Sequence, residues 1–123
     1  MLVEALIKNA EKIKEGKEIK PFEIKINRFE EMGIEGNIKV KKPDTSLLNS
    51  YIERNKDIKY LISECVIEPD LSNKELQSTF KVRNKKELVS KIFTEEEIND
   101  LDVAIGKIIN KTRTASLVDD IKN

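Results

Sequence analysis

The stretch from residue 65 to residue 98 holds the densest set of helix boundaries in the chain, and it limits the fold more than any other feature. Pro69 disfavours helical backbone at the residue before it, so the preceding helix is predicted to end near Ile67. Three pairs then stand at capping-box spacing, in which a capping side chain accepts from a free backbone N–H and a glutamate three residues later reaches back to the cap. The pairs are Ser72 with Glu75, Asn84 with Glu87, and Thr94 with Glu97. These boundaries predict a compact body of short helices.

The N-terminal residues show a helical pattern. Apolar side chains recur at spacings of three and four from Leu2 to Ile13, which predicts a helix over about residues 2–15. Gly16 follows, and a glycine at this point is typical of a left-handed residue just past a helix end.

A β-hairpin is predicted next. Apolar and polar residues alternate from Phe22 to Ile26, with Pro21 at the start of the strand, where proline is tolerated. A single helical turn closed by Gly33 separates it from a second strand over about residues 34–40. Strands this close in sequence most simply pair antiparallel. A lone hairpin is marginal in water, so it must pack on the helices or on another chain.

Helical spacing dominates the remainder of the chain. Breaks at residues 43–46 and 55–57 bound a helix, and apolar spacing then continues to Val66, so this part forms one bent helix or two. The last helix is predicted to begin at Thr94 with a narrow apolar stripe made of Ile98, Leu101, Ile105, Ile108 and Ile109.

These elements predict an α+β fold, a short antiparallel β-hairpin near the N-terminus followed by a predominantly α-helical body. We expect a single domain over residues 1–112, with the hairpin at about 19–42 and the helical body at about 45–111. Residues 113–123 form a polar tail.

The composition argues against an enzyme. The chain has no histidine, which removes the commonest general base and metal ligand, and its four glycines form no phosphate-binding loop. Its one cysteine, Cys65, lies on the apolar face of a predicted helix and is predicted to be buried and structural. No cofactor or metal is expected. A single cysteine, an N-terminus interrupted by Glu4 and Lys8, and no apolar run of membrane-spanning length predict a cytoplasmic protein.

Charge is balanced overall, with 23 basic and 23 acidic residues, but it is uneven locally. Residues 72–93 hold six basic and two acidic residues, a net charge of +4. One interpretation is a nucleic-acid-binding regulator that uses the short helices of this segment. The other is a solvated face balanced by acidic neighbours, with the aromatic residue Phe80 in the core. We favour the second, because a neutral chain lacks a general attraction to nucleic acid.

The tail offers a second candidate for contact with a partner. Leu117, Val118 and Ile121 are spaced as one turn of an amphipathic helix, which suits docking into a groove on another protein. A frayed terminus, or a tail folded back on the body, explains the same pattern.

In the helix-rich stretch, Val66-Ile67 is followed by Glu68, Pro69, Asp70 and Leu71, and then by Asn73–Leu76, Lys86–Val89 and Thr94–Ile98. This arrangement resembles the XkdN-like tail assembly chaperones of contractile-tailed phages, PBSX-like particles and tailocins. The similarity covers most of residues 1–110 in layout and is sharp over about residues 60–110. The order of a helix, a Lys-rich link and an Ile-Lys-Ile strand is also similar. The chain departs from the pattern in its basic connector at residues 81–84 and in its short tail.

The resemblance implies a non-catalytic assembly factor. Such proteins bind the long, helical tape measure protein, keep it soluble, and assist assembly of the tail tube protein. It implies action in the cytoplasm of the bacterial host and absence from the mature particle. The family has no defined active-site residues, so the signature Glu68–Leu71 is interpreted as structural.

Overall fold

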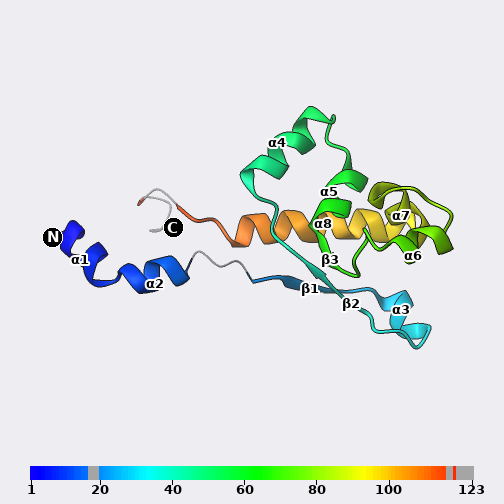
Figure 1. Ribbon diagram of the computed structural model, residues 1–123, viewed down its shortest axis with the longest axis horizontal. Helices are drawn as coiled ribbons and strands as arrows, with labels where there is room; N and C mark the ends of the chain where they lie inside the picture. The colour runs from blue at the N-terminus through cyan, green and yellow to red at the C-terminus, as the bar shows by residue number, and fades with distance from the viewer. Residues whose placement is uncertain (17–19, 116–117, 119–123) are drawn as a thin grey trace.

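The computed structural model describes residues 1–16, 20–115 and 118. Over these residues the chain forms a three-stranded antiparallel sheet and eight helices, so the predicted α+β class is confirmed (Figure 1). The strands are β1 (Phe22–Lys25), β2 (Asn37–Val40) and β3 (Val66–Glu68), in the order β1-β2-β3. The helices are α1 (Leu2–Lys8), α2 (Ala10–Glu15), α3 (Asn27–Glu31), α4 (Thr45–Glu53), α5 (Ile58–Cys65), α6 (Lys74–Thr79), α7 (Lys85–Ile92) and α8 (Glu95–Lys111).

The sheet is covered by helices on one face. β1 pairs with β2 so that Phe22 lies opposite Val40 and Ile24 opposite Ile38, which puts these four apolar side chains on the covered face. The alternate residues of the two strands are polar and exposed. Hydrophobic alternation therefore sets which face meets the core.

The third strand corrects the predicted helix end. α5 ends at Cys65, and β3 follows directly and pairs with β2 through Val66 and Glu68, where helix was predicted to continue to Ile67. Val66 and Ile67 are β-branched and favour strand, and the open edge of β2 offers backbone partners. With β3, the hairpin of β1 and β2 becomes part of a three-stranded sheet.

The predicted N-terminal helix is divided in two. Asn9 interrupts it with non-helical backbone, and its side-chain amide donates to the Ala5 carbonyl at 2.7 Å. Gly16 has right-handed backbone (φ −67°), so its predicted left-handed conformation is wrong. No residue of α1 or α2 is buried, and both helices lie at one end of the molecule, away from the helical body (Figure 1).

The helical body follows the predicted breaks, with two corrections at its caps. α4 and α5 are separate helices, divided where Asn55 and Lys56 adopt positive φ. The cap of α6 is Asn73, whose side chain accepts from Leu76 N–H at 2.9 Å, and not Ser72. Ser72 instead donates to Asp70, which forms a turn one residue before the helix.

The other two predicted caps are present. Asn84 accepts from Glu87 N–H at 2.8 Å, but the Glu87 carboxylate reaches Arg83 N–H and not that of Asn84. Thr94 forms a complete capping box with Glu97 at the start of α8. The complete capping box thus occurs at Thr94, whose side chain carries the hydroxyl that this motif uses, and not at Asn84.

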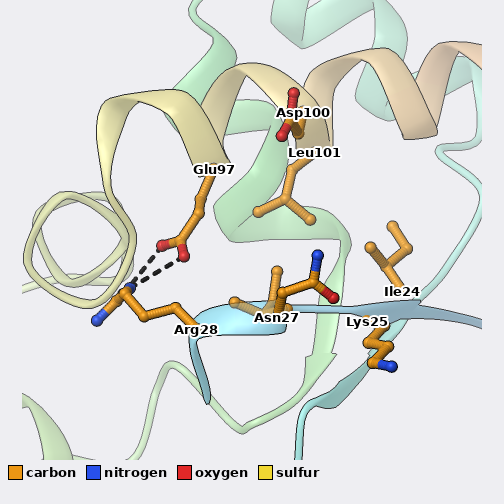
Figure 2. A pocket seen from close by; sticks show the side chains of 8 residues that line it. Ile24, Lys25, Asn27, Arg28, Glu97, Asp100 and Leu101 are labelled. Atoms are coloured by element: carbon orange, nitrogen blue, oxygen red, sulfur yellow. Dashed lines mark hydrogen bonds and ion pairs between the residues drawn. The ribbon is translucent and has the colours of Figure 1, made fainter. Parts of the chain in front are cut away.

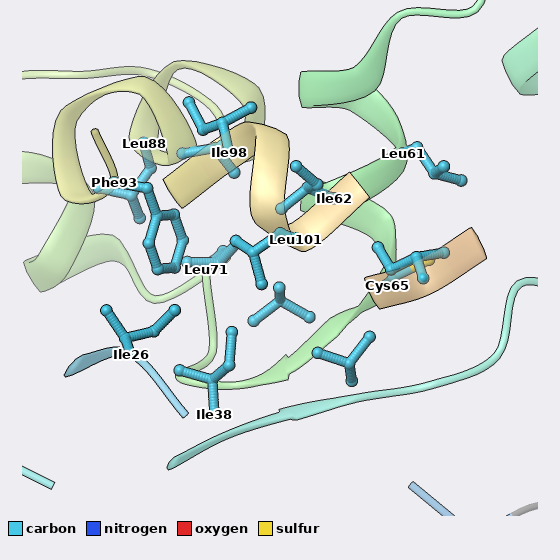
Figure 3. Packing of buried hydrophobic residues seen from close by; sticks show 14 residues of the cluster. Ile26, Ile38, Leu61, Ile62, Cys65, Leu71, Leu88, Phe93, Ile98 and Leu101 are labelled. Atoms are coloured by element: carbon cyan, nitrogen blue, oxygen red, sulfur yellow. The ribbon is translucent and has the colours of Figure 1, made fainter. Parts of the chain in front are cut away.

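The core lies between the sheet and helices α5, α7 and α8 (Figure 3). α8 buries the predicted stripe of Ile98, Leu101, Ile105 and Ile108, and Ile109 packs against the cluster. Full burial of one such side chain contributes about 1.5–3 kcal/mol, so these positions dominate the stability of the fold. Cys65 is fully buried, as predicted.

Candidate partner-binding surface

An apolar groove opens between α3 and α6. Its lining combines α3 and the loop after it, the proline after β3, α6 with its C-terminal cap, and α7: Phe29, Met32, Ile34, Pro69, Leu76, Phe80 and Ile92, with Arg28 and Lys91 at the rim. We call these nine residues the α3–α6 groove. Its cavity measures about 320 Å³. Met32, Ile34 and Phe80 are 60%, 52% and 38% exposed, so much apolar surface faces solvent here.

The α6 wall is positioned by a turn at the end of that helix. Lys81 adopts φ +58°, Val82 N–H donates to Gln77 O at 3.0 Å, and Lys81 N–H donates to Ser78 O at 3.0 Å. This is a Schellman motif with lysine at the left-handed position that glycine usually takes. The turn places Phe80 at the end of the helix, and this aromatic ring is exposed where the sequence predicted a core residue.

The α3 wall is held to the helical body by Arg28. Its guanidinium donates two bonds to the Glu97 carboxylate, at 3.0 and 2.9 Å (Figure 2). It donates a third bond to the Ile92 carbonyl at 2.6 Å. The neighbouring Phe29 ring stacks on Phe93 with centroids 5.9 Å apart. A bidentate guanidinium–carboxylate pair fixes orientation as well as distance, so it sets the angle of α3 against α7 and α8.

Electrostatics at this junction favour the charged pair. The hydrogen bond from Arg28 lowers the pKa of Glu97, and Thr94 adds to the effect through its backbone and side chain. The same hydrogen bond with Glu97 raises the pKa of Arg28. One carboxylate therefore completes the cap of α8 and anchors α3.

The family-signature residues lie beside the groove. Glu68 is at the end of β3, 3.4 Å from the Lys39 ammonium of β2, and Pro69 lines the groove. Asp70 accepts from Ser72, which lowers the pKa of Asp70. Leu71 is buried in the core. Glu68–Leu71 thus connects the sheet to α6.

Two of the basic residues in the segment 72–93 are engaged within the protein. Lys85 lies 3.0 Å from Glu64, and Lys86 pairs with Asp57 at the N-terminal cap of α5. These pairs lower the positive charge available to a nucleic acid on this face. Lys85 and Lys86 therefore contribute to the contact between α7 and α5.

Cys65 has the properties of an unreactive thiol. Burial raises its pKa to about 11, so it is protonated at neutral pH. Within the described ranges there is no group of three or more potential metal-ligating side chains, and no helix combines the length and apolar character needed to cross a membrane.

The predicted tail contact remains a prediction. Val118 is 69% exposed, while Leu117 and Ile121 lie outside the described residues.

The phage XkdN-like tail assembly chaperone family model matches residues 3–122. The chain belongs to this family. Neither the curated proteins nor the solved structures provide a match. Membership establishes the general role of a phage tail assembly chaperone, and it covers both the N-terminal helices and the helical body.

Sequence patterns did not indicate the α3 side of the groove. Met32 and Ile34 flank the predicted glycine turn at Gly33, and exposed apolar residues on both sides of a turn are the one local signal for this surface. No local pattern signals the contact of Arg28 with Glu97, because the two residues are 69 positions apart.

Proposed function

We propose that this chain binds the tape measure protein during tail assembly and does so through the α3–α6 groove. The family membership supports the role, and the groove supports the place, since it is an exposed apolar surface on a chain whose family acts on other proteins. The action is non-catalytic. Binding covers apolar helix surface of the tape measure protein before the tail tube protein assembles around it.

The chemistry of the groove fits one face of an amphipathic helix. Apolar anchors spaced three and four residues apart in a partner helix would contact Phe29, Ile34 and Phe80. Lys91 at the rim has no ion-pair partner among the described residues, so acidic side chains beside the apolar stripe complement it. A tape measure helix with acidic flanks is therefore the occupant we propose.

The proposed role places the protein in the host cytoplasm during assembly and outside the finished particle. Reversible contacts suit this, because a chaperone must release its client. A groove with a few exposed apolar side chains provides such contacts, whereas an interface of many buried residues would hold the client permanently.

Co-expression with the tape measure protein of the same genome tests the proposal. The wild-type chain should co-purify with its client, and Ile34→Asp or Phe80→Asp should weaken binding by about tenfold or more, because each puts a charge into an apolar contact. Ile52→Asp on α4 is the matched control, since Ile52 is also an exposed apolar residue (58%) and does not line the groove, and it should bind as wild type.

A separate variant tests the tail. Replacing Leu117, Val118 and Ile121 together by serine should weaken binding if the tail adds a second contact. Failure of the wild-type pair to co-purify at any ratio would contradict the proposed function. Equal binding by the groove variants and the Ile52→Asp control would place the contact elsewhere.

A further inference from the structure

The outer edge of β1 carries unpaired backbone groups. Ile26 N–H donates to Gly36 O at 2.7 Å, so the backbone N–H and C=O groups of Ile26 point toward β2. The register gives the backbone groups of Phe22 and Ile24 the same direction. Antiparallel pairing alternates, so Glu23 and Lys25 direct their N–H and C=O groups away from β2. β1 is the first strand of the sheet and has no other strand partner among the described residues.

The space beside this edge is open. A hollow of about 130 Å³ lies between the end of β1 and α8, lined among others by Ile24, Asn27, Asp100 and Leu101 (Figure 2). Ile24 is only partly buried, although its partner Ile38 is fully buried. The edge therefore has both free backbone groups and an incompletely covered apolar side chain.

We propose that two copies of this chain pair through β1, antiparallel, about a two-fold axis at Ile24. In this register Glu23 of each copy lies opposite Lys25 of the other, and both residues have the outward backbone direction that a hydrogen-bonded pair needs. Ile24 of one chain lies opposite Ile24 of the other, beside the hollow. Pro21, which has no N–H, ends the ladder.

Charge selects this register over its neighbours. A shift of two residues one way places Glu23 opposite Glu23, and a shift the other way places Lys25 opposite Lys25. Like charges directly opposite one another destabilise a strand pair, whereas opposite charges stabilise it. The exposed pair of residues on this strand is thus self-complementary in one arrangement, as a two-fold interface requires.

The existing ion pairs permit the exchange. Glu23 has no ion-pair partner among the described residues, and Lys25 lies 3.0 Å from Glu30 with both side chains about half exposed. An exposed pair of this kind is weak, so Lys25 can reach Glu23 of the second copy at little cost. The strand is short, so the dimer is reversible.

Sedimentation velocity on the full chain over a range of concentrations tests the proposal, with circular dichroism as the check on folding. Wild type should show a concentration-dependent dimer. Glu23→Lys and Lys25→Glu should each raise the dissociation constant by about tenfold or more, because each places like charges opposite one another. Both positions are exposed, but Glu23 also lies opposite Lys39 in its own sheet, so the circular dichroism of Glu23→Lys must match wild type before its dimerisation is compared.

Two rescues make the test specific to this register. The double variant Glu23→Lys with Lys25→Glu should dimerise as wild type. An equal mixture of the two single variants should form a mixed dimer, since one edge then carries two lysines and the other two glutamates. A wild-type chain that stays monomeric throughout, or a dimer that persists unchanged in both single variants, would overturn the proposal.

Discussion

At the scale of single residues, capping side chains determine where the helices of the body begin. Thr94 and Glu97 satisfy two backbone N–H groups at once, whereas α6 uses the amide of Asn73 alone. The shift from Ser72 to Asn73 follows from Asp70, which accepts from the Ser72 hydroxyl at 2.6 Å and so uses it in the preceding turn. Ser72 and Asn73 are both able to cap a helix, and the hydrogen bond of Ser72 to Asp70 leaves Asn73 as the cap of α6.

This assignment leads to a stability prediction. Asn73→Ala should lower the free energy of unfolding by about 1 kcal/mol, because the Leu76 N–H loses its acceptor. Ser72→Ala should change it by less than about 0.5 kcal/mol, as expected for an exposed residue that does not cap the helix. Urea unfolding of both variants measures the difference. Equal losses would show that Ser72 contributes to the cap.

At the scale of elements, α3 is the piece that depends most on distant contacts. It has five residues and no buried residue of its own, so its own helical bonds do not hold it in place. Arg28 and Phe29 fasten it to α7 and α8, which turns a loop between two strands into one wall of the groove. Stability at this junction therefore depends on the charge of Glu97.

The pH dependence of unfolding tests this anchor. The pKa of Glu97 is lowered from its ordinary 4.5 by Arg28, so its contribution is complete above pH 4.5 and is lost as the pH falls through the lowered value. Glu97→Gln should be less stable than wild type at pH 7, and the gap should narrow below pH 4.5. Glu96→Gln, in the same helical turn, is the control. A gap that stays constant with pH would contradict the anchor.

At the scale of the whole molecule, one core joins the sheet to α5, α7 and α8, while α1 and α2 contribute no buried residue. Cys65 lies inside this core at the junction of α5 and β3. Its thiol is therefore a reporter of global unfolding.

Thiol labelling should follow complete unfolding and not local motion. Labelling of Cys65 in the native protein should be slow and should accelerate along the urea transition. Burial raises the pKa of Cys65 from 9.0 to about 11. The contribution of the neutral thiol to the free energy of unfolding is therefore fully present below pH 9 and is lost as the pH rises toward 11. Cys65→Ala should remove that alkaline loss. Rapid labelling without denaturant would show that the α5–β3 junction opens on its own.

The sequence by itself determined the α+β class, the predicted breaks between helices, the buried stripe of α8, and the family resemblance. These features depend on capping hydrogen bonds and on hydrophobic periodicity between residues that are a few positions apart in the sequence. Only the tertiary structure decided the third strand, the exposure of Phe80 and the groove, because these need partners far apart in sequence, as Arg28 and Glu97 are. The capped stretch that limited the fold therefore supplies one side of the groove, and α3 supplies the other.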